Sequence, residues 1–217
     1  MKWGYLSRNV ADLVEIPRPK KQEFKTWTPE QVKIFLRTAE NDRFYALYML
    51  ATTTGARKGE LLALKWTNIN LEQGTLQIKE TIQEVPGKGL LFSQPKSEKS
   101  RRSITLPGLT VRALRQHREL NPDSELVFTT SNKTPISPRN LVKYFKRLVD
   151  EAGLPEIRFH DLRHTCATIL LSENVHQKVV QELLGHSQIN LTLDTYSHVL
   201  PVMQERAAQK MDEVLSN

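Results

Sequence analysis

The sequence is poor in cysteine and has no long apolar run. Cys166 is the only cysteine, which excludes an internal disulfide and a cysteine-ligated metal cluster and leaves this residue as a small core side chain. No window approaches the roughly 18 consecutive apolar residues of a membrane-spanning helix, and the N-terminal segment lacks the apolar stretch of a secretory signal. We therefore expect a soluble, cytoplasmic protein stabilised by an ordinary hydrophobic core.

Positive charge is in moderate excess. The 217 residues include 31 Lys and Arg against 24 Asp and Glu, a formal net charge of +7. This balance favours a polyanionic partner, although many proteins of this size carry it without binding nucleic acid. A composition with 39% hydrophobic and 25% charged residues is typical of a globular chain and excludes a mostly disordered one.

The first residues differ in character from the rest of the chain. Residues 1–16 have the pattern of a short helix, and the PRPKK stretch at 17–21 has that of a stiff basic linker. So short a helix cannot bury its apolar side alone, so we interpret residues 1–21 as the tail of a missing preceding domain plus a linker. The main domain is expected over residues 22–217, and the TPEQ capping box after Trp27 marks its first helix.

Most of this main domain has helical periodicity. Between residues 68 and 107, the alternating segments TLQIKETIQ, GLLFSQP and RRSITLP predict three strands, and LVFTT predicts a further short one. Further helices are expected at residues 43–54, 58–64, 109–120, 138–152, 161–172, 176–184 and 202–215. The expected fold class is α+β, mainly helical, with a small three-stranded antiparallel sheet.

One expected helix, at 138–152, carries positive charge on the side opposite its apolar residues. Its basic side chains are Arg139, Lys143, Lys146 and Arg147, and no acidic residue occurs between positions 126 and 149. A solvated helix face would explain the pattern, and so would contact with the phosphates of duplex DNA. These four residues are candidate DNA-binding residues.

The string HDLRHT opens the helix expected at 161–172. His160 and Arg163 are three residues apart, which places them on one face about one turn apart. An imidazole beside a guanidinium is costly unless an anion lies between them, and a phosphate supplies that anion. His160 and His164 also have the spacing of a helical metal pair, but Arg163 would then lie beside the cation. Ordinary packing is the third interpretation.

Three more residues have both a structural and a functional interpretation. Arg57 follows a glycine turn at the start of a helix, where backbone N–H groups favour anions, yet it can also pair with Glu60. His186 follows a glycine at a helix end, where a histidine often only caps the helix. Tyr196, in DTYSHVLP, can be a half-buried packing residue.

The last expected helix carries a narrow apolar stripe. Met203, Ala207, Met211 and Leu215 are four residues apart on an otherwise charged helix. A stripe this thin fits a groove better than a core, and Pro201 interrupts the chain just before it. The segment can pack on its own domain or on a neighbouring copy.

Taken together, two arginines, two histidines, a tyrosine hydroxyl and a hairpin lysine would make a metal-free phosphoryl-transfer site. The strings GARKGE, PKSEKSRRSITLP, HDLRHT, LLGHS and DTYSHV occur in this order. On these five motifs, residues 22–217 resemble the catalytic domain of tyrosine recombinases, the phage-integrase family, and especially the integrases of phages and conjugative elements.

The resemblance implies six catalytic residues: Arg57, Lys96, His160, Arg163, His186 and Tyr196. In the family the arginines clamp the scissile phosphate, the tyrosine attacks it, the first histidine takes the tyrosine proton and the hairpin lysine protonates the leaving group. Lys99, Arg101 and Arg102 lie in the same hairpin and remain alternatives to Lys96 as that acid.

The resemblance also implies an activity. It implies a bacterial, nucleoid-associated recombinase that cleaves and rejoins DNA through a 3′-phosphotyrosyl intermediate, integrates or excises a mobile element, and needs no metal or cofactor. The implied partners are double-stranded attachment-site DNA and further copies of the chain, in a homotetramer linked by the C-terminal helix. A non-cleaving DNA-binding regulator and a type IB topoisomerase-like enzyme are the alternatives.

Overall fold

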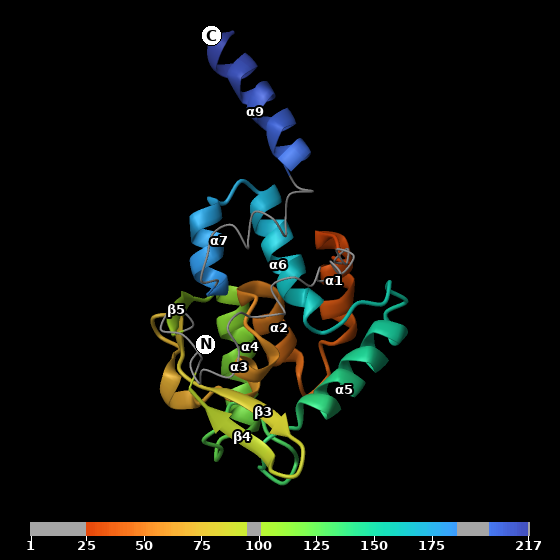
Figure 1. Ribbon diagram of the computed structural model, residues 1–217, viewed down its shortest axis with the longest axis vertical. Helices are drawn as coiled ribbons and strands as arrows, with labels where there is room; N and C mark the ends of the chain where they lie inside the picture. The colour runs from red at the N-terminus through yellow and green to blue at the C-terminus, as the bar shows by residue number, and fades with distance from the viewer. Residues whose placement is uncertain (1–24, 95–100, 186–199, 217) are drawn as a thin grey trace, which may run out of the picture.

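The computed structural model describes residues 25–94, 101–185 and 200–216, and of the last segment the side chains from residue 208 onward (Figure 1). Several sequence predictions lie outside these residues: the domain tail and linker at 1–21, Lys96, Lys99, His186, Tyr196, and the side chains of Met203 and Ala207.

The predicted capping box starts the first helix, α1 (Pro29–Thr38). The Thr28 hydroxyl accepts a hydrogen bond from the Gln31 amide at 3.3 Å, and the Gln31 side chain accepts one from the Thr28 amide at 2.9 Å. Just before it, Trp27 packs its ring on Phe35 and Phe145, with centroids 5.1 and 5.9 Å apart. These aromatic contacts bind α1 to α5 (Pro138–Glu151) in the main hydrophobic core.

Helix α2 (Tyr45–Thr54) is buried along almost its whole length. It packs against α4 (Gly108–Leu120) and α6 (Asp161–Ser172), and Figure 1 shows it in the middle of the domain. An apolar helix surrounded in this way is the core of the fold. Gly55 ends it in the left-handed conformation, with φ of +60°, and the short helix α3 (Lys58–Leu62) follows.

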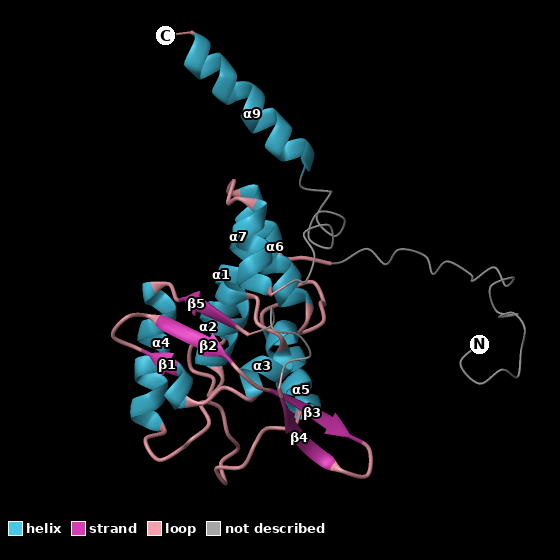
Figure 2. Ribbon diagram, turned by 60° about the vertical axis from the view of Figure 1, so that its left-hand side comes forward, coloured by secondary structure: helices cyan, strands magenta, loops and turns pink. Residues whose placement is uncertain are grey.

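The strands form two antiparallel sheets. β1 (Ile69–Asn70), β2 (Thr75–Ile78) and β5 (Arg102–Thr105) make a three-stranded sheet in the order β1-β2-β5. β3 (Thr81–Val85) and β4 (Gly89–Ser93) make a separate hairpin, which Figure 2 shows at the lower edge of the domain. The predicted fold class is confirmed. A small three-stranded antiparallel sheet is present, but its three strands are not the same as the three predicted.

The difference arises within TLQIKETIQ, which we predicted as one strand. It forms both β2 and β3, with a break at Lys79 and Glu80. β2 pairs with β5, with Thr75 opposite Thr105, whereas β3 pairs with β4. Similarly, LVFTT makes only two isolated bridges, Lys65 with Leu126 and Thr129 with Pro135, rather than a strand.

Two helices complete the fold. α7 (Gln177–Leu184) packs against α6, while α9 (Leu200–Leu215) lies apart from the other helices in both views (Figures 1 and 2). The helices predicted within the described residues therefore occur at the expected places, with ends that differ by a few residues at most. Within the described ranges, none of the helices combines the length and the apolar character needed to cross a membrane.

Candidate functional site

The turn after α2 brings two of the predicted arginines to one place. A Cβ atom on Gly55 would lie 2.5 Å from Leu184 Cδ2 and 3.6 Å from Arg163 Cγ, so only glycine allows α6 and α7 to pack this closely on the turn. The Gly55 carbonyl accepts a hydrogen bond from Arg163 Nη1 at 2.8 Å. Arg57, two residues later, donates from Nη2 to the Gly185 carbonyl at 3.4 Å.

The two arginines differ in exposure. Arg163 is buried, with 3% of its surface accessible, whereas 38% of the Arg57 side chain is accessible. Arg163 is therefore held rigidly against the turn, while Arg57 presents its guanidinium at the surface beside it. One guanidinium group at the start of α3 and one in α6, each bound to a backbone carbonyl, can together attract an anion.

Glu60, a buried residue of α3, is the acidic partner of Arg57. Its carboxylate accepts hydrogen bonds from Arg57 Nη1 at 2.8 Å and from the Arg57 amide at 2.9 Å, which is the ion pair expected from the sequence. It also accepts two from Arg102, at 2.8 and 3.2 Å. Burial alone would raise the pKa of Glu60, but the hydrogen bonds and charge of Arg102 and Arg57 outweigh it and lower the pKa. The carboxylate is thus charged.

His160 precedes α6, one turn before Arg163. Partial burial lowers its pKa, and the neighbouring charge of Arg163 lowers it further. The next histidine of the motif, His164, is buried and packs edge-on against His160, with ring centroids 5.3 Å apart. Burial and His160 lower the pKa of His164 to about 4. Both imidazoles are therefore neutral at neutral pH, and a neutral His160 can accept a proton.

The one acidic residue of the HDLRHT motif, Asp161, has a structural role. Its carboxylate binds the Arg158 side chain at 2.8 Å and the Arg158 amide at 2.8 Å. In the described ranges no cluster of three His, Cys, Asp or Glu side chains has the arrangement of a metal site. His160 and Arg163, one turn apart at the start of α6, stay candidate anion-binding residues.

The four basic residues of α5 fall into two pairs. Lys146 forms an ion pair with Glu156 at 3.0 Å, and Arg147 forms one with Asp42 at 3.1 Å. Arg139 and Lys143 are exposed and make no ion pair with any residue that the structure describes. Although residues 126–149 contain no acidic residue, acids from other parts of the chain compensate Lys146 and Arg147. Among the four, only Arg139 and Lys143 are uncompensated by any described residue.

The sequence-predicted residues Lys96, His186 and Tyr196 lie outside the described residues. Among the alternatives for the hairpin acid, Arg102 is buried and held by Glu60 and the Leu183 carbonyl, which argues against an acid role. Arg101 is exposed and donates to the Gln94 side chain.

The sequence alone missed the Arg102–Glu60 and Arg158–Asp161 contacts. The second could have been found, since its residues are three apart at the start of a helix. The first joins residues 42 positions apart, and no local pattern signals it.

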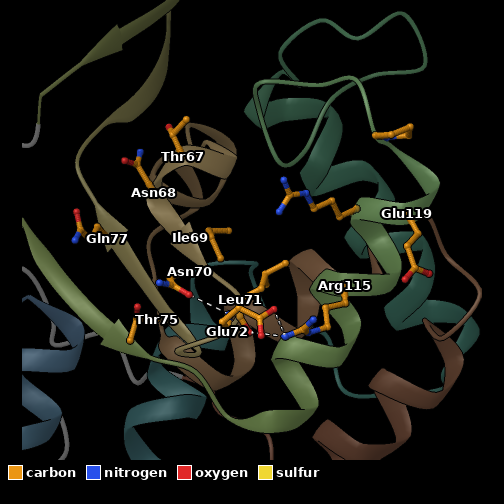
Figure 3. Close-up of a pocket in the computed structure, with 12 residues that line it drawn as sticks. Thr67, Asn68, Ile69, Asn70, Leu71, Glu72, Thr75, Gln77, Arg115 and Glu119 are labelled. Atoms are coloured by element: carbon orange, nitrogen blue, oxygen red, sulfur yellow. Dashed lines mark hydrogen bonds and ion pairs between the residues drawn. The ribbon is translucent and has the colours of Figure 1, made fainter.

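A separate hollow lies between β1 and α4, and Figure 3 shows it. This open groove of about 880 Å³ is lined by polar side chains such as Asn68, Asn70 and Gln77, and Arg115 on its rim is already bound to Glu72 and the Leu71 carbonyl. None of the sequence-predicted site residues lines it. It is therefore distinct from the site built around Arg57 and Arg163.

Comparison with known proteins identifies the family. Residues 25–202 match the phage integrase family. The chain is 33% identical to a tyrosine recombinase XerC-like protein of Caldanaerobacter subterraneus, over 97% of this chain and 61% of that protein. It is 28% identical to the ICEBs1 integrase of Bacillus subtilis, over 97% of this chain and 60% of that protein. The chain thus spans about three fifths of the length of these relatives.

Solved structures share the fold. The Tn1549 transposon integrase in complex with transposon right end DNA superposes with a TM-score of 0.77, at 22% identity, over 93% of this chain and 71% of that one. The XerA recombinase gives a TM-score of 0.72, at 21% identity, over 89% of this chain and 66% of that one.

Proposed function

The chain belongs to the phage integrase family, and we propose from this premise that it is the catalytic part of a site-specific DNA recombinase. The observation that carries the proposal is the convergence of Arg57 and Arg163 on the turn at Gly55, with neutral His160 one turn from Arg163. The substrate is double-stranded attachment-site DNA, and the outcome is integration or excision of a mobile element.

In the first step, the Tyr196 hydroxyl attacks the scissile phosphorus. A free tyrosine has a pKa near 10, so its proton must be accepted as the new bond forms, and His160 takes it. The bond from phosphorus to the 5′ oxygen breaks, and Lys96 protonates the leaving oxygen. The products are a 3′-phosphotyrosyl bond and a free 5′ hydroxyl.

Arg57 and Arg163 stabilise the charge that develops on the non-bridging phosphate oxygens, and His186 donates a further hydrogen bond. The two arginines supply the electrostatic stabilisation that metal ions supply in other phosphoryl transfers. The phosphotyrosyl bond keeps the energy of the phosphodiester, so a 5′ hydroxyl from another strand can attack it in the reverse reaction. Strand exchange then requires no energy-rich cofactor.

The test is covalent capture of the intermediate. The full-length gene product is incubated with a nicked suicide duplex taken from the DNA that flanks its gene, and the mixture is denatured and separated. We expect the wild type to form a covalent adduct. Tyr45→Phe, which changes a tyrosine of α2 and serves as the control, should form it too. Because the proposed reaction needs no metal ion, both adducts should also form in buffer that contains EDTA. Tyr196→Phe should bind the duplex equally well and form no adduct, because it lacks only the nucleophilic oxygen.

Each alternative predicts a different result. A non-cleaving regulator forms no adduct even with the wild type, although all six predicted catalytic residues are present in this sequence. A type IB topoisomerase-like enzyme forms the adduct but relaxes supercoiled DNA without pairing two sites. An adduct in Tyr196→Phe would show that another residue is the nucleophile.

We further propose that the active form is a homotetramer linked by α9. The described side chains of this helix are exposed although several are apolar, with Met211 57% and Leu215 75% accessible. Exposed apolar side chains on a terminal helix favour docking on another surface, and head-to-tail docking of identical copies closes into a ring.

Truncation after Pro201 tests the tetramer. We expect the truncated protein to bind a single site and to fail in assembling paired sites, as measured by gel shift and light scattering. Met211→Ala with Leu215→Ala should weaken paired assembly, whereas Gln209→Ala, on the same helix, should not. Normal assembly of the truncated chain would contradict docking by α9.

A further inference from the structure

Arg102, the first residue of β5, is an arginine in an unusual environment. Only 6% of its side chain is accessible. Its two terminal nitrogens donate to the Glu60 carboxylate at 2.8 and 3.2 Å, and its Nε donates to the Leu183 carbonyl at 2.6 Å. One side chain of β5 thus contacts both α3 and the C-terminal end of α7.

The contact with Glu60 determines the charge left on Arg57. Glu60 is 3% accessible and is bound by two guanidinium groups, the buried one of Arg102 and the 38% exposed one of Arg57. A buried carboxylate must be compensated. Because Arg102 compensates it from inside, the cluster keeps a net charge of +1, and Arg57 carries that charge at the surface. Without Arg102, Arg57 would be the one ionic partner left to Glu60 among the described residues, and its charge would be neutralised.

The contact with Leu183 determines where Arg57 rests. Gly185, two residues after Leu183, ends α7 with φ of +67° and accepts the hydrogen bond from Arg57 Nη2 at 3.4 Å. Arg102 therefore fixes the helix end on which the Arg57 guanidinium lies. In the sequence, β5 directly follows the segment that contains Lys96, and α7 directly precedes His186.

We infer that Arg102 is a positioning residue for phosphate binding: it neutralises Glu60 so that Arg57 keeps its charge for the scissile phosphate, and it holds the α7 end against which Arg57 is oriented. The inference rests on the proposed function. Arg102 is buried and acts through Glu60 and Arg57.

The experiment measures the single-turnover cleavage rate of the full-length protein at saturating suicide duplex, together with duplex affinity. For Arg102→Met we expect the rate to fall by about tenfold or more, as for other small displacements of a catalytic group, with affinity nearly unchanged. The cleavage rate of Arg102→Lys should lie between those of Arg102→Met and the wild type, because lysine keeps the charge but not the two parallel hydrogen bonds.

The distinguishing readout is rescue by a second substitution. Adding Glu60→Gln to Arg102→Met removes the carboxylate that would otherwise compensate the charge of Arg57. The cleavage rate of the double variant should therefore rise above that of Arg102→Met alone. A purely structural role predicts the opposite, since the second substitution removes further hydrogen bonds. Arg115→Met is the matched control: Arg115 also binds a carboxylate, of Glu72, and a backbone carbonyl, of Leu71, away from the site. It should cleave at the wild-type rate.

The inference is overturned if Arg102→Met cleaves within about threefold of the wild type, or if Glu60→Gln lowers its rate further. Should Arg102→Met fail to fold, as judged by circular dichroism, Arg102→Lys decides. A wild-type rate in this variant overturns the inference, and a reduced rate at unchanged affinity supports it. Failure of the wild type itself to form an adduct would refute the proposed function, a separate result.

Discussion

At the level of single residues, burial sets the protonation states at the start of α6. His164 is enclosed and has a pKa of about 4, because burial and the adjacent His160 disfavour its charged form. Burial is also the main reason why the pKa of His160 is lowered. The structure thereby keeps the imidazole beside Arg163 neutral, and a neutral imidazole is what the proposed proton transfer from tyrosine requires.

His164 makes stability depend on pH. The unfolded chain binds a proton at His164 below about pH 6.5, whereas the folded protein resists it until about pH 4. The free energy of unfolding should therefore decrease as pH falls through this window, by up to about 1.4 kcal/mol per pH unit from this residue. Urea unfolding at pH 7.5, 6 and 5 measures the slope.

The matched variant is His164→Asn, which removes the titrating group. Its unfolding free energy should change less between pH 7.5 and 5, with a residual slope from groups such as His117, whose pKa burial also lowers. An equal slope in variant and wild type would show that His164 does not resist protonation in the folded state.

At the level of secondary-structure elements, close backbone approach decides how the hairpin sits on the domain. Gly59 in α3 contacts β3 so closely that an added Cβ would lie 2.6 Å from the Ile82 carbonyl oxygen and would also clash with the Thr81 hydroxyl. Glu84 of the same strand binds the Ser137 hydroxyl at the start of α5, at 3.0 Å. The hairpin therefore bridges α3, which directly follows Arg57, and α5, which carries the basic face.

Gly59→Ala should force the hairpin away from α3. Overpacking of this kind costs about 1–3 kcal/mol of unfolding free energy, measured by chemical denaturation. Gly108→Ala, at the start of α4, is the control, because the nearest atom to its added Cβ would be Arg112 Nη1 at 3.8 Å. A control as unstable as Gly59→Ala would show that the contact with β3 is not the cause of the destabilisation.

At the level of the whole molecule, the ion pairs separate the basic residues that can bind phosphate from those already compensated. On α5, Arg139 and Lys143 make no ion pair with any described residue, while Lys146 and Arg147 pair with acids from other parts of the chain. Counterion release on DNA binding depends on the uncompensated charges.

Salt dependence of DNA affinity tests this division. Replacing Arg139 and Lys143 with alanine should reduce the slope of log affinity against log salt by about 2, if both contact phosphates. Replacing Lys146 and Arg147 should reduce it less, since their charges are already paired. If the variant that lacks Arg139 and Lys143 has the same slope as the wild type, the basic face of α5 is only a solvated surface and does not contact DNA phosphates.

The sequence alone determined those features whose signals are local. The capping box at Thr28, the helix-ending Gly55 and Gly185, and the helical spacing of residues 161–172 specify backbone conformation through neighbouring residues, and the structure agrees with them. The family was also recognisable from short motifs in a fixed order, because catalytic chemistry constrains residue types over a few positions.

Tertiary structure alone decided which elements pair. The alternation of buried residues continues in phase from Leu76 through Ile82, so no periodicity marks the break where β2 ends and β3 begins with a different partner. The partnership of Arg102 with Glu60 is likewise invisible in the sequence. Side-chain period reflects only which face is buried, whereas partner choice depends on the packing of segments far apart in the chain.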